Sequence, residues 1–172
     1  VVVAGKALAE IQDGRIDHET TSNVGDIKGG GSTNIVPDTV RLHAETRSLN
    51  LAKLTAQSKH IEDAFTRVAT ANNAVATVNV TRLYEPFVVD EDAPVVQLAS
   101  EAATRTGLTA VVRSTGGGSD ANFFNTYGVP TAVLTTGMSK VHTTEEFIKE
   151  EDLYNTARWV VEIIRLAAEQ KR

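Results

Sequence analysis

A loop histidine with hydroxyl and carboxylate neighbours is the residue best suited to metal chemistry in this chain. His142 stands in the segment 137–146, which follows an apolar stretch. An imidazole nitrogen is a common metal ligand, and nearby hydroxyls and carboxylates can orient it. A zinc centre needs three or four ligands, and the sequence contains neither an H-x-x-x-H nor an H-E-x-x-H pattern. Taken alone, His142 is open to two interpretations, a metal ligand or a solvated loop residue.

Three consecutive glycines form a second candidate site, this time for an anion. Residues 116–118 stand between a predicted strand and a predicted helix, so backbone N–H groups and the positive end of the helix dipole could face a ligand. No Lys-Ser/Thr pair follows and the G-x-G-x-x-G spacing is absent, which argues against a nucleotide phosphate. A substrate carboxylate is the better candidate. The alternative is a tight turn in which the glycines adopt positive φ.

Two further polar residues lie before and within a predicted strand over 38–48. Asn34 follows a glycine turn, and Arg47 shares the polar face of the strand with His43 and Glu45. A guanidinium in that position can hold a carboxylate through two parallel hydrogen bonds. It can equally pair with Glu45, and the residues alone favour this pairing.

Composition and charge argue against several classes of partner. Lys and Arg number 17 and Asp and Glu 22, a formal charge of −5 without a basic stripe, which argues against nucleic acid or an anionic membrane. No apolar run approaches the roughly 20 residues that span a bilayer. With no cysteine, the chain has no disulfides and no thiolate metal ligands, and this fits a cytoplasmic protein.

The elements that position these residues fall into two patterns. The first part alternates helical and strand periodicity, and its predicted elements are a helix over 2–13, a hairpin of strands over 20–28 and 38–48, a helix over 50–71 capped by Asn50 or Ser48, and a strand over 75–83. One further strand before residue 1 would complete a split β-α-β-β-α-β sandwich. We therefore expect an α+β unit here.

The second part has an α/β pattern and begins after a linker over 84–94. Its predicted elements are a helix from a cap at Asp92 to Gly107, strands over 109–113 and 131–135, a short helix over 120–126 and a last helix over 150–170. The last helix places Leu153, Val160 and Ile164 on one apolar face, and Trp159 is expected in the core. Two strands are too few to form a sheet alone, so this part looks incomplete.

Three segments in series resemble a known enzyme family. They are residues 29–38 with 44–48, residues 116–122, and residues 137–146 with the histidine. Their order and spacing are similar to those of dinuclear-zinc peptidases and amidohydrolases, which include peptidase T, aminoacylase, acetylornithine deacetylase and succinyl-diaminopimelate desuccinylase. The resemblance extends over nearly all 172 residues and is greatest to the peptidase-T-like branch.

The resemblance implies an α/β catalytic domain interrupted by a small α+β lid. Residues 1–83 would be the lid or dimerisation domain, ferredoxin-like and without its first strand. Residues 84–172 would be the C-terminal segment of the catalytic domain. The family further implies two zinc ions in the complete enzyme, a small peptide or N-acyl amino acid as substrate, and a homodimer formed through the lid.

The resemblance also assigns roles to particular residues. His142 is similar to the last zinc ligand of the family. Asn34 and Arg47 are similar to lid groups that bind the carbonyl or carboxylate of the substrate. The residues similar to the loop that receives the terminal carboxylate are Gly117, Gly118 and Ser119.

Other parts of the family's pattern have no counterpart in this sequence. The H-x-D motif, the bridging Asp, the Glu-Glu pair and a further Asp all precede the lid in the family, so no catalytic residue is assigned within this chain. The chain begins at Val1 and its one methionine is Met138. We therefore expect a fragment or a processed chain that is inactive by itself and binds zinc weakly.

Amide-bond hydrolysis by metal-activated water is thus the expected activity of the whole enzyme. The alternative is a non-catalytic dimerisation or amino-acid-binding regulatory module, because a split β-α-β-β-α-β unit can serve as a sensor. A nucleotide-binding α/β protein using residues 116–118 is a third possibility, and the missing Lys-Ser/Thr pair counts against it.

Overall fold

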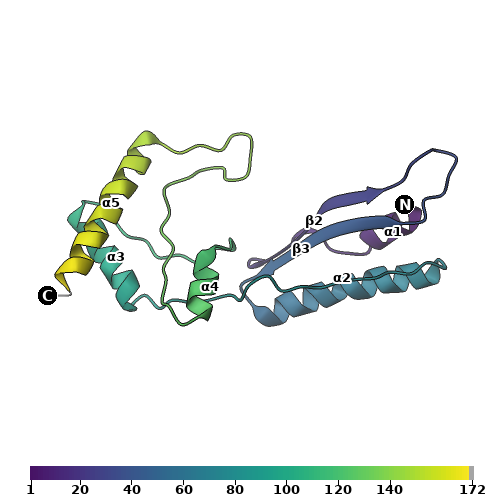
Figure 1. Cartoon of the computed structure of the whole chain (residues 1–172), viewed down its shortest axis with the longest axis horizontal. Helices are drawn as coiled ribbons and strands as arrows, with labels where there is room; N and C mark the ends of the chain where they lie inside the picture. The colour runs from purple at the N-terminus through teal and green to yellow at the C-terminus, as the bar shows by residue number, and fades with distance from the viewer. Residues whose placement is uncertain (171–172) are drawn as a thin grey trace. The chain divides into compact units, whose positions relative to one another are not determined.

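The computed structural model describes residues 1–170, which divide into two compact units (Figure 1). Unit 1 is Val1–Pro86, and unit 2 begins at Phe87. None of the helices in the described residues combines the length and the apolar character that a bilayer crossing requires.

Unit 1 is an α+β structure built on a small antiparallel sheet. Its strands are ordered β1-β2-β3. The elements are α1 (Val2–Leu8), β1 (Gly14–Arg15), β2 (Thr20–Gly29), β3 (Val40–Ser48) and α2 (Leu51–Ala71). Figure 1 shows α2 running alongside the long hairpin of β2 and β3.

The predicted hairpin is confirmed, and its register explains the glycines that flank its loop. Gly29 faces Val40 across the strand pair, and a Cβ on Gly29 would come within 2.8 Å of the Val40 Cγ2. Only glycine allows the two backbones to approach so closely. A register shift between Val24 and Asp26 places a bulge at Gly25. Opposite this bulge Ala44 is exposed, although strand alternation predicts that it is buried.

The predicted helix over 50–71 is also confirmed, together with its cap. The Asn50 side-chain oxygen accepts hydrogen bonds from the N–H groups of Ala52 and Lys53, at 2.9 and 3.2 Å. These bonds satisfy two of the backbone donors that a helix start leaves without an intrahelical partner. The helix then buries Ile61 and Ala64 against Ile11, which forms the core of unit 1.

The first helix is shorter than the 2–13 expected from its apolar spacing. It ends at Leu8, and the chain turns so that Ile11 reaches the core beside α2. Gly14, predicted to end this helix, instead opens β1 with a φ of 79°. Burial of one isoleucine side chain outside the helix thus overrides the helical periodicity, because it removes a large apolar area from water.

Unit 2 is a set of helices joined by long extended segments. Its helices are α3 (Pro94–Arg105), α4 (Asp120–Thr126) and α5 (Glu150–Glu169). The α3 and α5 helices pack together, and the Trp159 indole N–H donates to the Ala99 carbonyl at 2.7 Å. Leu166 is buried at 2% exposure. Trp159, expected in the core, contacts α3 but is only half-buried, so this expectation is met in part.

Three predicted strands are wrong, and all three lack a partner. Within residues 1–170 the structure assigns no strand to 75–83, 109–113 or 131–135. An extended segment becomes a strand only when its N–H and C=O groups pair with a neighbouring chain. The first segment retains a trace of the expected alternation, with Ala76 half-buried and Val75 exposed.

Two further details of unit 2 differ from expectation. The N-cap of α3 is Ala93 rather than Asp92, and Ala93 makes no side-chain cap. Pro94 lies at the helix start as predicted. In α5 the apolar face expected to be buried is exposed, with Leu153 at 55% and Ile164 at 64%. The side of α5 that carries the buried Leu166 also carries the half-buried Trp159, which contacts α3.

Candidate functional site

His142 lies in a closed loop between the last extended segment and α5. The Ser139 N–H donates to the Phe147 carbonyl at 2.9 Å, and the Phe147 N–H donates to the Ser139 carbonyl at 3.1 Å. This pair of bonds closes the segment 140–146 into a short loop. His142 is exposed, which leaves its side chain accessible.

The backbone of this loop adopts an unusual conformation. Lys140 has φ 53° and His142 has φ 65°, and the third non-glycine residue with positive φ in the described part of the chain is Asn73. The left-handed region costs an ordinary L-residue roughly 1–2 kcal/mol. Such strain is concentrated at functional sites, where surrounding contacts enforce it. The conformation is thus an observation independent of sequence motifs that favours a functional His142.

Glu146, whose pairing with Glu145 is typical of carboxylates that complement a helix dipole, instead contacts the backbone of this loop. Glu146 Oε2 accepts a hydrogen bond from the His142 backbone N–H at 2.7 Å. Its neighbour Glu145 pairs instead with the Lys140 ammonium. The H-x-x-x-E spacing from His142 to Glu146 is the signal that could have indicated the contact.

Gly137 fixes where the loop departs from the extended segment. Its φ is 82°, and a Cβ there would lie 2.9 Å from the Asp152 Cβ. Asp152 belongs to the first turn of α5, so the backbone of Gly137 packs directly against that helix. The glycine is therefore required both by its conformation and by the available space.

The glycine loop leads into α4 through a capping box. Ser119 Oγ accepts the Ala121 N–H at 3.3 Å, and the Asn122 side-chain oxygen accepts the Ser119 N–H at 2.9 Å. These bonds set the start of the helix. The loop and Ser119 are exposed, as a ligand site requires.

The alternative interpretation of the glycine loop is a turn in which the glycines need positive φ. This interpretation is wrong for Gly116 and Gly117. Gly116 and Gly117 do not have positive φ. A Cβ on Gly116 meets nothing within 4 Å, and one on Gly117 meets the Thr115 Oγ1 at 3.7 Å. Neither the local conformation nor the packing within the chain therefore requires glycine at these two positions.

Asn125 ties α4 to the next extended segment and was not anticipated. Its side-chain amide donates to the Thr131 carbonyl at 2.9 Å and accepts the Thr131 N–H at 3.1 Å. A side-chain amide that bonds both backbone groups of Thr131 takes the place of a strand neighbour. No periodic pattern marks a residue of this kind.

In unit 1, Arg47 forms an ion pair with Glu45 on the polar face of β3, as the residue pattern favours. This contact raises the pKa of Arg47, because the carboxylate stabilises the charged guanidinium. Asn34 is exposed in the loop between β2 and β3. The predicted site residues are thus divided between the units, with Asn34 and Arg47 in unit 1 and His142 in unit 2. The other predicted site residues in unit 2 are Gly117, Gly118 and Ser119.

A cluster of metal-ligand type in unit 1 is explained by an ion pair. Asp17, His18 and Glu19 bring three ligand atoms within 4.8 Å of one another. The Lys53 ammonium lies 2.9 Å from Asp17 and 2.6 Å from Glu19, and thus already occupies both carboxylates as an ion-pair partner. The pKa of Asp17 is well below its usual value, first because of Lys53 and then because of the Glu19 N–H. We conclude that the cluster anchors the start of β2 to α2.

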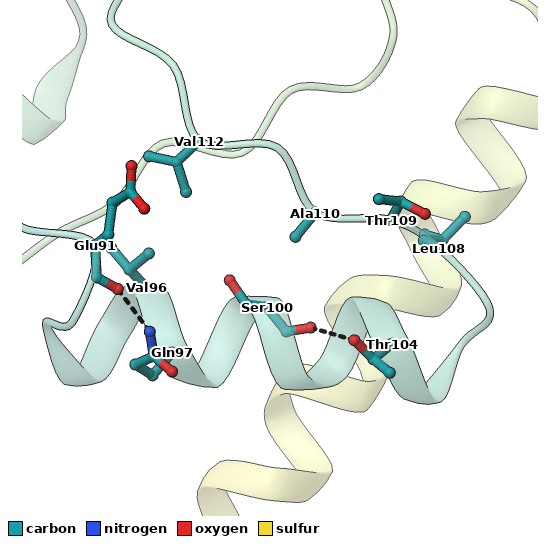
Figure 2. Close-up of a pocket in the computed structure, with 9 residues that line it drawn as sticks. All are labelled: Glu91, Val96, Gln97, Ser100, Thr104, Leu108, Thr109, Ala110 and Val112. Atoms are coloured by element: carbon teal, nitrogen blue, oxygen red, sulfur yellow. Dashed lines mark hydrogen bonds between the residues drawn. The ribbon is translucent and has the colours of Figure 1, made fainter.

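A groove of about 500 Å³ lies in unit 2 between α3 and the segment that follows it (Figure 2). Ser100 and Thr104 face it from the helix, and Ala110 and Val112 face it from the segment. The acidic residue on its lining is Glu91, whose backbone carbonyl accepts a bond from Gln97 at 2.7 Å. None of the predicted site residues lines this groove, so it is separate from the candidate site.

Comparison with known proteins identifies the family. The family model described as peptidase family M20/M25/M40 matches residues 4–166. The uncharacterized protein YqjE of Bacillus subtilis (strain 168) is 39% identical over 98% of this chain, which covers 45% of that protein. The chain therefore spans about half the length of this relative.

Three solved structures resemble the chain. Aminopeptidase PepT of Bacillus cereus ATCC 10987 is 42% identical with a TM-score of 0.78, over 97% of this chain and 45% of that one. A tripeptidase of Staphylococcus aureus subsp. aureus Mu50 is 38% identical with a TM-score of 0.85, over 98% and 45%. The Bacillus subtilis YXEP protein, a dinuclear metal binding peptidase from the M20 family, shares the fold at 22% identity and a TM-score of 0.63, over 97% and 46%. The chain belongs to peptidase family M20/M25/M40.

Proposed function

We propose that the full-length protein containing this chain is a zinc-dependent peptidase that hydrolyses an amide bond in a small peptide or an N-acyl amino acid. The observation that carries the proposal is the similarity of nearly the whole chain to a solved aminopeptidase and a solved tripeptidase. The M20 relative with a dinuclear metal site supports the metal assignment.

The described residues fit one position of such a metal centre. His142 offers an imidazole from an exposed loop, and a zinc centre takes three or four ligands. The one group of three ligand atoms found within residues 1–170 is the cluster at Asp17, whose two carboxylates already pair with Lys53. His142 would therefore hold zinc together with ligands from outside the described residues. We propose that this chain alone binds zinc weakly and is inactive.

Bound zinc would supply a Lewis acid for amide hydrolysis. The residues of this chain would bind and orient the substrate. We propose that Gly117, Gly118 and Ser119 receive the terminal carboxylate of the substrate. The lack of any local need for glycine at Gly116 and Gly117 supports this, because an open backbone allows close approach of a ligand.

The lid residues would complete substrate binding. We propose that Asn34 donates a hydrogen bond to the substrate carbonyl and that Arg47 holds a substrate carboxylate. Arg47 already binds the Glu45 carboxylate, so its guanidinium is placed for such a partner and would exchange one carboxylate for another. Holding the substrate in register in this way is a positional contribution to catalysis.

We further propose that residues 1–83 act as a lid that mediates dimerisation and that residues 84–172 belong to the catalytic domain. The division of the structure after Pro86 supports two separate roles. In the described residues β3 pairs on one side only, with β2, and an edge strand is a natural site for pairing with a second copy. Analytical ultracentrifugation of the full-length protein tests this; a strictly monomeric protein would contradict it.

The test of function uses the full-length gene product with zinc. We expect it to cleave a tripeptide or an N-acyl amino acid and to lose that activity on chelation. Arg47→Met should raise KM about 10–100-fold, because a charge-assisted hydrogen bond to the substrate is lost. Arg41→Met on the same strand is the matched control and should leave KM unchanged. No turnover of either substrate class with any divalent metal would contradict the proposal.

A further inference from the structure

The backbone of His142 depends on one side-chain contact. Within the loop the Thr143 N–H and hydroxyl both donate to the Lys140 carbonyl, at 3.2 and 2.7 Å. The Glu146 N–H donates to the Thr143 carbonyl at 3.2 Å. The His142 N–H, by contrast, donates to a side chain, at Glu146 Oε2.

This contact is suited to holding a left-handed residue. With a φ of 65°, His142 has neither the extended nor the right-handed helical conformation, and its N–H is paired with a side chain. The acceptor is a carboxylate four residues later, and a charged acceptor makes a stronger bond than a carbonyl does. The bond length of 2.7 Å agrees with a charge-assisted contact.

We propose that Glu146 is a positioning residue that fixes the backbone of His142 and thereby presents its imidazole from the loop. The inference rests on the proposed role of His142 as a metal ligand. Glu145 has a different task, because its carboxylate pairs with Lys140. The two adjacent glutamates therefore provide a matched comparison within one loop.

The test is NMR spectroscopy of the ¹⁵N-labelled chain in three variants. Glu146→Ala should raise the amide exchange rate of His142 about tenfold, the effect of losing one hydrogen bond to a charged group. It should also weaken the strong intraresidue amide–Hα cross peak that a positive φ produces. Glu146→Gln retains an acceptor oxygen and should restore both signals to within about twofold. Glu145→Ala should resemble the wild-type chain.

Two results would overturn the positioning role. One is an unchanged His142 amide in Glu146→Ala. The other is an equal change in Glu145→Ala, which would indicate a general loosening of the loop. Amide spectra of α5 and β2 show in the same experiment whether each variant is folded.

A zinc titration separates this inference from the proposed function. In the full-length protein, we expect zinc to shift the ring resonances of His142 more than those of His18, His43 and His60, which are exposed outside the loop. Glu146→Ala should weaken the apparent zinc affinity about tenfold, as loss of an orienting group does. Equal shifts at all four histidines would contradict the metal role of His142, whereas the exchange data would still decide whether Glu146 positions it.

Discussion

The two units differ in how they pair their backbone N–H and C=O groups and in how they bury their apolar side chains. In unit 1 the strands pair with one another, and α2 buries Ile61 and Ala64 on its inner face. In unit 2 the segments 109–113 and 131–135 are extended without a strand partner among residues 1–170. The α5 helix buries one apolar face and exposes another.

This contrast shows what apolar periodicity measures. A repeating pattern reports which residues are suited to burial, and it does not report whether a partner is available. YqjE, PepT and the tripeptidase are each more than twice as long as the part that this chain covers. We expect those proteins to cover the corresponding apolar positions with polypeptide outside the matched region.

The largest expected effect comes from the two faces of α5. Leu166→Ala should destabilise unit 2 by about 3 kcal/mol, because the side chain is 2% exposed and leaves a cavity. Ile164→Ala, 64% exposed, should cost about 0.5 kcal/mol or less. Urea unfolding followed by fluorescence of Trp159, the single tryptophan, measures both. Equal losses would mean that the exposed face is covered in solution.

Helix caps give a smaller difference between the units. Asn50→Ala should cost about 1 kcal/mol in unit 1, since two backbone N–H groups lose their acceptor. Ala93→Asn should stabilise α3 by about 0.5–1 kcal/mol, because Ala93 has the extended φ and ψ of an N-cap without a capping side chain. Hydrogen exchange of the first-turn amides of α2 and α3 reports each change. A neutral Ala93→Asn variant would show that unit 2 does not benefit from a cap.

The smallest expected effect on stability at neutral pH concerns the ion pair of Asp17 with Lys53, which anchors the start of β2 to α2. Lys53 lowers the pKa of Asp17 in the folded chain below the roughly 3.9 of an unfolded aspartate. The stabilisation is therefore complete above about pH 4 and is lost as the pH falls toward the lowered value. Asp17→Asn should flatten the acid dependence of unit 1, and Lys53→Met should act in the same direction. Circular dichroism melts at pH 7 and pH 3 measure this; an unaltered pH dependence would contradict it.

The parts of the fold that were predictable from sequence are those with local causes. The hairpin and the Asn50 cap follow from strand alternation, glycines and capping chemistry. The end of α1 was not predictable, because it depends on Ile11 reaching a helix some 50 residues later in the chain. Three strands were predicted that the structure does not form, because a strand requires a neighbouring chain and periodicity cannot reveal whether one is present.

The candidate site was predictable only as residue types. His142 stands out because an imidazole can bind a metal, and the glycines stand out because three in a row leave the backbone open to a ligand. The contacts of Glu146 and Gly137 were not predictable, because one acts through a backbone N–H and the other through the absence of a Cβ near Asp152. Contacts of this kind become visible only in three dimensions.

The unpaired segments of unit 2 have a practical consequence for anyone handling this polypeptide. Val111 and Val133 are 64% and 55% exposed, on stretches that have no strand partner among residues 1–170. Exposed apolar edges of this type are templates for intermolecular β-sheet and for aggregation. Concentrated samples are therefore expected to self-associate, and a lysine at Val111 is the simplest way to keep them dispersed.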